Sequence, residues 1–331
     1  MPINPTPINE GSLESKKQIR RNEKEDIIFT LLTPKFSFED MVLDEVTYNT
    51  IQDIMSTLEY SDLIYNKWGL SKVIKEQKSM CANFYGEPGT GKTMAANAIA
   101  NHLGKKILRV NYADIESKYV GETSKNLVKL FNEAKKVDAL LLFDEADALL
   151  SRRVTDMSNA TDVSVNQTRS VLLTLLETYT GMIIFTTNFI SNFDSAFMRR
   201  IPYHVRFDLP NGELRVKLWH HYLVPELPAD VNIEEISEKY PGISACDIVN
   251  ATLMASLKAA RNNLMRVPQE YFEEALKHIK DSMLANSKNQ TVKVEARDVS
   301  QEYALSQIKT KEEVSNDCDG INFRSGFFSR S

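Results

Sequence analysis

Residues 86–93 read GEPGTGKT, a spacing of glycines, lysine and threonine that can hold a chain of phosphates. The glycines let backbone N–H groups wrap the phosphates, Lys92 reaches the β- and γ-phosphate oxygens, and the Thr93 hydroxyl can bind magnesium. From residue frequencies, a chance match somewhere in such a chain is about one in a hundred, so a glycine-rich turn without a ligand is the weaker interpretation. The predicted nucleotide-binding residues are Gly86, Glu87, Pro88, Gly89, Thr90, Gly91, Lys92 and Thr93.

A second motif, LLLFDEAD, occupies residues 140–147. An apolar strand would place Asp144 and Glu145 at its carboxyl end, where ligands of open α/β sheets bind. Asp144 could hold magnesium, directly or through water, and Glu145 could polarise an attacking water as a general base. The alternative is that both acids only cap the next helix. Because the phosphate-binding sequence precedes them, we favour hydrolysis.

Three more residues could assist this chemistry. Asn188 follows the apolar run MIIFTT, and its neutral amide could position the attacking water, although asparagine after a strand is also a common turn residue. Arg199 and Arg200 lie in FDSAFMRRIP (193–202), which we expect to contain a short helix. A basic pair near a helix end ordinarily faces solvent. One or both arginines could instead reach the γ-phosphate held by a neighbouring subunit and stabilise transition-state charge.

A parallel sheet would bring these residues together. Between Phe36 and about Pro210, short apolar runs alternate with helical patterns, which predicts an α/β domain whose sheet is covered on both faces. The five predicted strands are CANFY (81–85), KILRV (106–110), ALLLF (139–143), MIIFTT (182–187) and YHVRFDL (203–209). Beyond Asn211 the strand signal stops, and the predicted helices are 213–224, 232–240, 245–262 and 268–285.

These patterns divide the chain into four predicted parts. They are a flexible N-terminal arm (1–35), a large α/β domain (36–210), a small all-helical domain (211–287) and a polar C-terminal tail (288–331). We expect the arm to turn helical near residues 23–32, and the tail to hold a strand over 291–296 and a short helix after Asp298.

The composition excludes several classes of protein. The 331 residues carry a net charge of −5 at pH 7, whereas a nucleic-acid-binding protein usually shows a basic excess. The three cysteines, Cys81, Cys246 and Cys318, are far apart and fit neither a disulfide framework nor a zinc site. No apolar run approaches the ~20 residues needed to span a bilayer. We expect a soluble, cytoplasmic protein without membrane contact.

As a set and in this order, the motifs resemble the AAA clade of AAA+ ATPases, from about Phe36 to about Ala285. GEPGTGKT resembles Walker A, LLLFDEAD Walker B, and Asn188 the sensor-1 residue. NFISNFDSAFMRRI resembles the second region of homology, whose arginines reach the adjacent ATP. GISACDIVNATLMASLKAA (242–260) resembles the lid segment, with Ala245 and Cys246 where Gly-Ala is usual. The resemblance implies a P-loop large domain with a helical lid, ATP and Mg²⁺ as ligands, and a homohexamer.

The resemblance also gives a role to ESKYVGETSK (116–125), where an aromatic residue stands in a charged segment. Clade members that thread proteins carry a loop with the pattern K-(W/Y/F)-(V/I/L)-G-E in the central pore. Its counterparts here are Lys118, Tyr119, Val120 and Gly121. An aromatic ring can grip an extended chain without regard to sequence, and glycine lets the loop bend. The alternative is that Tyr119 packs against its own helix.

The leading hypothesis is therefore a ring that uses ATP to remodel a protein substrate. Residues 159–181 are also similar to a region of bacterial relatives of the pachytene-checkpoint ATPase. That similarity implies a HORMA-domain substrate and regulation of an antiviral nucleotidyltransferase complex (CBASS). One alternative is a nucleic-acid AAA+ protein such as a helicase loader, which the basic residues of segment 16–24 favour and the acidic net charge disfavours. Another is a nucleotide-gated scaffold, which would not need Lys92, Glu145, Asn188 and Arg199 together.

Overall fold

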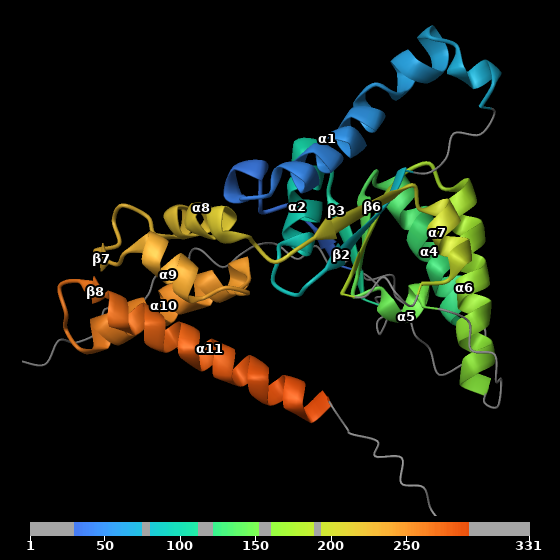
Figure 1. The fold of residues 1–331 in the computed structure, drawn as a ribbon. Helices are drawn as coiled ribbons and strands as arrows, with labels where there is room; N and C mark the ends of the chain where they lie inside the picture. Colours follow the sequence, from blue (N-terminus) through green and yellow to red (C-terminus); the bar gives the residue numbers. More distant parts are fainter. Residues whose placement is uncertain (1–29, 75–79, 112–121, 152–159, 189–192, 291–331) are drawn as a thin grey trace, which may run out of the picture. The chain divides into compact units, whose positions relative to one another are not determined.

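The computed structural model describes residues 30–74, 80–111, 122–151, 160–188 and 193–290 (Figure 1). The chain divides into two compact units, Met1–Lys280 and Asp281–Ser331. Of the second unit, the described residues are 281–290, the end of helix α11. The predicted strand over 291–296 and the helix after Asp298 lie outside the described residues, as do residues 1–29 of the predicted arm.

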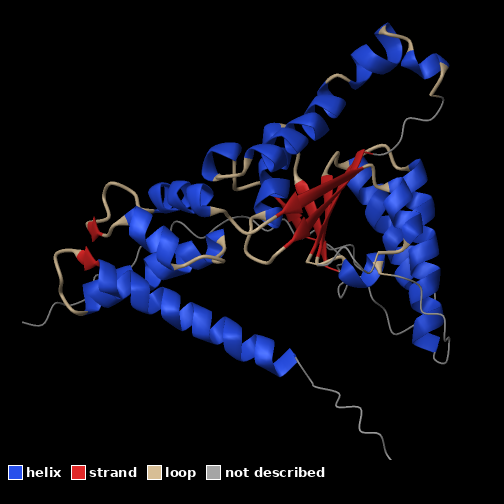
Figure 2. Cartoon of the chain, viewed as in Figure 1, coloured by secondary structure: helices blue, strands red, loops and turns tan. Residues whose placement is uncertain are grey.

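A six-stranded sheet in the order β1-β3-β4-β5-β2-β6 forms the centre of the α/β part (Figure 2, red). The strands are β1 (Thr30–Leu32), β2 (Met80–Gly86), β3 (Ile107–Asn111), β4 (Leu140–Asp144), β5 (Met182–Thr187) and β6 (Tyr203–Phe207). Strands β2 to β6 pair in parallel. They coincide with the five predicted strands, so the predicted α/β fold with a parallel sheet is confirmed.

The edge strand β1 differs from the prediction. Residues Thr30–Leu32 pair antiparallel with Ile107–Arg109 of β3, so the expected helix near residues 23–32 is wrong at this end. Three residues, Thr-Leu-Leu, are too short to show a strand period of their own. The unpaired N–H and C=O groups along the edge of β3 determine their conformation.

Helices cover both faces of the sheet. The helices of the α/β part are α1 (Glu45–Glu59), α2 (Lys92–His102), α4 (Glu122–Lys136), α5 (Asp147–Leu150), α6 (Ala160–Thr178) and α7 (Ser195–Arg200). Apolar residues of α1 and α2, among them Ile51 and Ile99, form one core cluster on one face. Residues of α4 to α7, among them Phe131 and Phe197, form another on the opposite face (Figure 1). Short helical turns also occur at Phe38–Asp40, Leu63–Lys67 and Leu70–Lys72.

The alternation of side chains along β3 and β4 assigns each residue to a face. Leu108 and Val110 join the cluster beside α4 to α7, whereas Ile107 joins the cluster beside α2. By the same alternation, Arg109 and Asp144 project from the face that α2 covers. Two residues of opposite charge, Arg109 and Asp144, thus lie on the same face of the sheet.

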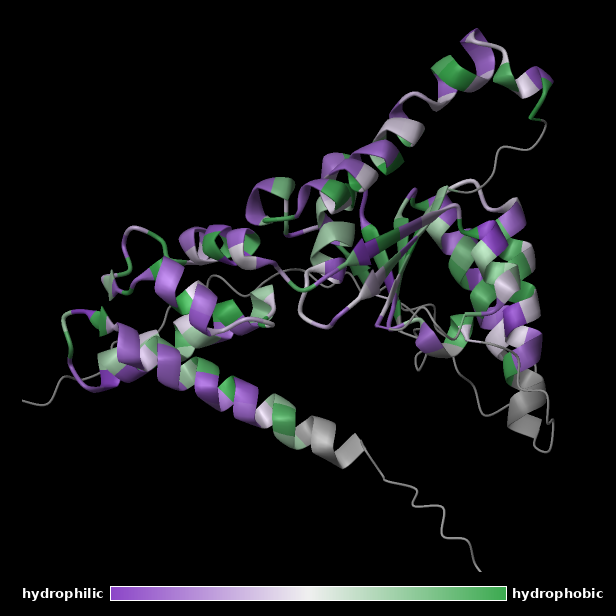
Figure 3. Ribbon diagram, viewed as in Figure 1, coloured by the Kyte–Doolittle hydropathy of each residue, from purple (hydrophilic) through white to green (hydrophobic). Residues whose placement is uncertain are grey.

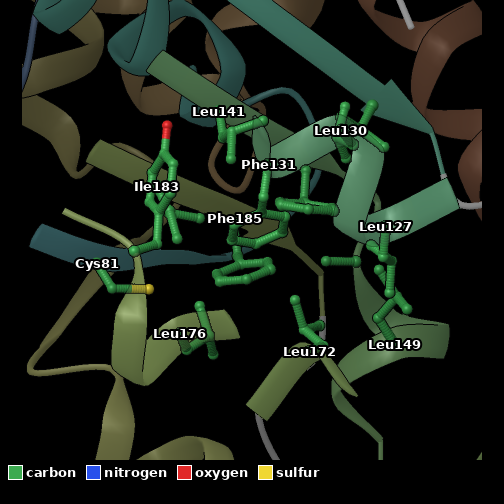
Figure 4. Packing of buried hydrophobic residues seen from close by; sticks show 14 of the residues in the cluster. Cys81, Leu127, Leu130, Phe131, Leu141, Leu149, Leu172, Leu176, Ile183 and Phe185 are labelled. Atoms are coloured by element: carbon green, nitrogen blue, oxygen red, sulfur yellow. The ribbon is translucent and has the colours of Figure 1, made fainter. Parts of the chain in front are cut away.

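Phe185 of β5 lies at the centre of the cluster on the α4–α7 side (Figure 4). Its side chain is fully buried, and its ring stacks on Phe143 of β4 with the ring centroids 5.0 Å apart. Figure 4 shows Leu141, Leu172 and Leu176 around it. These two stacked rings, one from each of two neighbouring central strands, therefore pack the sheet against the helices on this face.

Helices α8 (Gly212–Tyr222), α9 (Ile233–Lys239), α10 (Ala245–Arg261) and α11 (Gln269–Gln290) follow β6. They have a core of their own, in which Trp219 and Phe272 meet edge to face at 5.9 Å. Figure 3 shows hydrophilic residues along much of α11. The four predicted helices are present, and the two-residue strands β7 (Ala229–Asp230) and β8 (Val267–Pro268) were not predicted. The predicted domain boundaries, and the assignment of these helices as a lid, stay predictions.

The buried Arg215 of α8 fixes the start of this helical part. Its guanidinium donates to the carbonyl oxygens of Pro210 (2.8 Å) and Ser237 (3.1 Å). The N-cap residue Asn211 accepts from the backbone N–H of Leu214 at 2.8 Å, which satisfies one of the unpaired donors of the first turn. Among the described helices, none is long and apolar enough to cross a membrane.

Truncating Phe185 tests the packing of the sheet. Phe185→Ala should lower the free energy of unfolding by about 3–5 kcal/mol, because it removes a fully buried ring and leaves a cavity. Denaturant unfolding followed by circular dichroism measures the change. Val46→Ala, at a residue that is 76% exposed, is the control and should change stability by less than about 0.5 kcal/mol. Equal effects of the two substitutions would contradict this packing.

Candidate nucleotide-hydrolysis site

The predicted phosphate loop joins the end of β2 to the start of α2. Gly86, Gly89 and Gly91 have φ angles of +135°, +74° and +99°, a region that favours glycine. A Cβ atom at Gly86 would lie 2.1 Å from the carbonyl oxygen of Phe207 on β6. The loop conformation therefore depends on glycine for both its backbone angles and its contact with the neighbouring strand.

The Lys92 side chain lies inside this loop. It is 8% exposed, and its ammonium group donates to the carbonyl oxygens of Gly86 (2.8 Å) and Glu87 (2.7 Å). Burial lowers the pKa of Lys92, while the negative charges of Glu87, Asp147 and Asp144 oppose that shift. These contacts hold a donor group at the mouth of the loop, where a phosphate oxygen could replace the carbonyls as its partner.

Asp144, at the carboxyl end of β4, lies directly beside Thr93. Its Oδ1 atom accepts from the hydroxyls of Thr93 (3.1 Å) and Thr186 (2.5 Å). Magnesium prefers oxygen ligands at 2.0–2.1 Å, so adjacent corners of its octahedron are about 2.9 Å apart. The separation of the Thr93 and Asp144 oxygens is close to that value, and these two residues fit a magnesium site.

Thr186 also shapes the turn after β4. Its hydroxyl accepts from the backbone N–H of Glu145 at 3.3 Å, and its carbonyl accepts from the N–H of Ala146 at 2.9 Å. Glu145 has a φ of +54°, in the left-handed region, and its side chain is exposed. β5 thus holds this turn in place, and Glu145 lines the cavity beside the phosphate loop.

A cavity of about 440 Å³ opens between these elements, within the range of small-molecule sites. The phosphate loop, the end of β4 and the end of β5 contribute to it, and Asn188, an exposed residue, lies on its wall. The helical part contributes Tyr222, Ala245, Cys246 and Val249. The lining residues are Pro88, Gly89, Gly91, Lys92, Thr93, Met94, Asp144, Glu145, Thr186, Thr187, Asn188, Tyr222, Ala245, Cys246 and Val249.

The start of α10 touches the phosphate loop. Ser244 and Asp247 form a capping box, with the Ser244 hydroxyl donating to Asp247 Oδ2 at 2.7 Å, which fixes the first turn of the helix. The backbone N–H of Cys246 then donates to the carbonyl of Gly89 at 3.1 Å. A Cβ atom at Gly89 would lie 2.6 Å from the Ser244 hydroxyl. Ala245 and Cys246, which stand where the resemblance leads us to expect Gly-Ala, line the cavity.

The structure does not bring the arginine pair to this cavity. Arg199 is exposed on α7, and Arg200 pairs with Glu177 at 2.6 Å and donates to the carbonyl of Ala196 at 3.2 Å. Within the described part of the chain, no arginine lines the cavity. The predicted pore loop, Lys118 to Gly121, lies outside the described residues.

Three polar residues of the site were missed by the sequence reasoning. Thr186 and Thr187 end β5, and the Thr187 hydroxyl donates to Asp147, the last acid of LLLFDEAD. Arg109 of β3 donates to Asp144 Oδ2 at 2.5 Å. Two signals were available: two hydroxyl residues close the apolar run MIIFTT, and one arginine interrupts the run KILRV.

A parallel sheet, a glycine-rich loop around a buried lysine, and a threonine–aspartate pair at the next strand end define a P-loop nucleotide-binding domain. Residues 82–209 match the family model described as "ATPase family associated with various cellular activities (AAA)". Residues 82–209 are thus similar to AAA ATPase domains, which supports the predicted ATP hydrolysis.

Three relatives extend the comparison. The chain is 29% identical over 295 residues to the cell division cycle protein 48 homolog of Archaeoglobus fulgidus, covering 83% of this chain and 39% of that protein. It is 32% identical over 200 residues to the 26S proteasome regulatory subunit 8 homolog of Schizosaccharomyces pombe (58% and 50%). It is 28% identical over 281 residues to the ATP-dependent zinc metalloprotease FtsH 2 of Thermoanaerobacter sp. (82% and 51%). The chain thus spans between 39% and 51% of the lengths of these relatives.

Replacing Thr186 tests its place in the site. Thr186→Val keeps the shape of the side chain but removes the hydroxyl that contacts both Asp144 and the turn at Glu145. We expect magnesium-dependent nucleotide affinity or turnover to fall about 10- to 100-fold, as for other residues that orient metal ligands. Thr174→Val is the matched control, since among the described residues the Thr174 hydroxyl bonds the Ser170 carbonyl of its own helix and no other group. A Thr186→Val protein with wild-type turnover and magnesium dependence would rule out this role.

Proposed function

We propose that this protein couples ATP hydrolysis to the remodelling of a protein substrate within a ring of identical subunits. The observation that carries the proposal is the convergence of Lys92, Thr93, Asp144, Glu145 and Asn188 on one cavity. Each has the chemistry that one part of ATP hydrolysis requires. The three relatives support work on proteins, since their names include a proteasome subunit and an ATP-dependent protease.

In the proposed reaction, Lys92 binds the β- and γ-phosphate oxygens, and Thr93 and Asp144 hold Mg²⁺. The bound ion supplies positive charge to the phosphate oxygens. Glu145 accepts a proton from a water while that water attacks the γ-phosphorus, and the Asn188 amide orients the water. The bond between the γ-phosphorus and the bridging oxygen breaks, which yields ADP and inorganic phosphate.

In the proposed ring, a neighbouring subunit supplies the arginine that is missing among the described residues lining the cavity. We propose that Arg199 and Arg200 reach the γ-phosphate bound by a neighbouring subunit, because no described arginine of the same chain lines the cavity. Arg199 is exposed, and Arg200 would exchange its exposed partner Glu177 for the phosphate. A surface ion pair of this kind contributes about 0–1 kcal/mol, so the exchange costs little.

We propose that Lys118, Tyr119, Val120 and Gly121 form the substrate-gripping loop, on the resemblance of their sequence alone. A HORMA-domain protein is the first substrate to test, because of the similarity of residues 159–181 noted above. Its remodelling would regulate an antiviral nucleotidyltransferase complex. The hexameric state and the cytoplasmic location are part of the same proposal and rest on the sequence.

Mixing two inactive variants tests hydrolysis between subunits. Glu145→Gln should bind ATP but lose at least about 100-fold in turnover, because the general base is absent. The double variant Arg199→Ala/Arg200→Ala should lose turnover for lack of positive charge at the γ-phosphate. Mixed rings contain sites with an intact Glu145 beside an intact arginine pair, so the mixture should regain activity in a steady-state ATPase assay.

Two controls accompany this experiment. Glu238→Gln, on the exposed surface of α9, should keep wild-type turnover. Equilibrium binding of ATP confirms that the variants still bind nucleotide. If the mixture stays as inactive as its components, the arginines do not act between subunits, and full turnover by Glu145→Gln would eliminate it as the base.

Tyr119→Ala separates hydrolysis from remodelling. The variant should hydrolyse ATP at a rate near that of the wild type but fail to remodel a HORMA-domain protein, because the aromatic grip is lost while the cavity is intact. ATPase rates with the protein substrate and with single-stranded DNA, beside a conformational assay of the substrate, provide the measurement. Stimulation by DNA alone, with no effect of Tyr119, would favour the nucleic-acid alternative instead.

A further inference from the structure

Arg109 is a polar residue of the site that the proposed reaction does not use. It lies on β3, where its backbone is paired with Leu142 of β4, and it shares a sheet face with Asp144. Residues diagonal to each other on neighbouring strands lie within reach of a long side chain. The Arg109 guanidinium spans this diagonal and contacts Asp144 Oδ2 at 2.5 Å.

The two oxygens of Asp144 have different partners. Oδ1 contacts the hydroxyls of Thr93 and Thr186, and Thr93 is the other predicted magnesium ligand, so Oδ1 is the oxygen on the metal side. Oδ2 contacts Arg109. The Asp144 side chain is 12% exposed and that of Arg109 is 51% exposed. A largely buried carboxylate is therefore neutralised by a cation that reaches it from the solvent side.

The acidic residues around the cavity determine what the contact between Arg109 and Asp144 does. Glu87, Asp144 and Asp147 lie close enough to Lys92 to influence it electrostatically, and Glu145 lines the same cavity. Among the described residues, Lys92 lies near three of these acids and Arg109 pairs with Asp144. Without Arg109, four acids would face one lysine, an arrangement that attracts a divalent cation. With Arg109 in place, a bare Mg²⁺ ion beside Asp144 is repelled by a fixed positive charge.

We propose that Arg109 is a built-in counter-ion of Asp144 that keeps free divalent cations out of the site until a nucleotide brings its own negative charge. This inference rests on the proposed magnesium role of Thr93 and Asp144. The triphosphate offsets the repulsion from Arg109, so the metal enters as part of the metal–nucleotide complex. Arg109 is a positioning residue that acts through Asp144 and forms no bond to the reacting atoms.

The test is divalent-cation binding to the full chain without nucleotide. Mn²⁺ binding is followed by electron paramagnetic resonance, and the thermal midpoint is recorded with and without Mg²⁺. Arg109→Gln should bind Mn²⁺ at least about tenfold more tightly than the wild type, because a positive charge beside a divalent ion has been removed. Mg²⁺ alone should raise the thermal midpoint of this variant and leave that of the wild type nearly unchanged.

Two further variants isolate the effect of charge. Arg109→Lys keeps the positive charge and should exclude Mn²⁺ nearly as well as the wild type. Arg206→Gln removes an arginine from the exposed ion pair with Asp208 and should leave Mn²⁺ binding unchanged. If Arg109→Gln binds Mn²⁺ no better than the wild type, or needs more Mg²⁺ for nucleotide binding, Arg109 is not a counter-ion that excludes metal.

Asp144→Asn separates failure of this inference from failure of the proposed function. In the wild type, nucleotide affinity should depend on Mg²⁺, and Asp144→Asn should weaken that dependence. If wild type and Asp144→Asn bind nucleotide alike at every Mg²⁺ concentration, the metal site itself is wrong and the inference falls with it. If both behave as proposed while Arg109→Gln matches the wild type, only the inference about Arg109 is overturned.

Discussion

Oδ1 of Asp144 accepts hydrogen bonds from two residues that are distant in the sequence, Thr93 at the start of α2 and Thr186 near the end of β5. These contacts exist only if β2, β4 and β5 end at the same edge of the sheet. The register of the parallel strands provides that alignment: Phe143 of β4 pairs with Phe185 of β5, and Asn83 of β2 pairs with the same Phe185. The geometry of the site is thus a consequence of the packing of the sheet.

That packing also explains why polar groups can be buried beside the core. Thr186 and Thr187 are 2% and 1% exposed, yet their hydroxyls bond to Asp144 and Asp147. A buried hydroxyl without a partner is destabilising, and a buried carboxylate more so. Here each group satisfies the other, so the strand ends can carry acids into a largely buried environment.

The sequence predicted the parts of this site that depend on local pattern. Alternating apolar runs placed the five parallel strands, and GEPGTGKT and LLLFDEAD placed Lys92, Thr93, Asp144 and Glu145 at strand ends. Non-local contacts were not predictable in this way. Nothing in KILRV indicates that Arg109 reaches across to β4, and nothing in Thr30–Leu32 indicates a strand, because each is determined by a neighbour far away in the chain. The pairing of Arg200 with Glu177 on α6 is of the same kind.

Glu145 has a left-handed backbone conformation, which lowers the stability of the fold, and it is also the proposed catalytic base. A non-glycine residue in this region costs roughly 1–2 kcal/mol, and here the bonds from β5 to the turn maintain it. Glycine would relieve the strain and remove the carboxylate of a residue that lines the cavity. A search for stabilising substitutions, made without regard to activity, would therefore tend to select against the proposed catalytic base. The proposed base thus occupies a backbone conformation that lowers the stability of the fold.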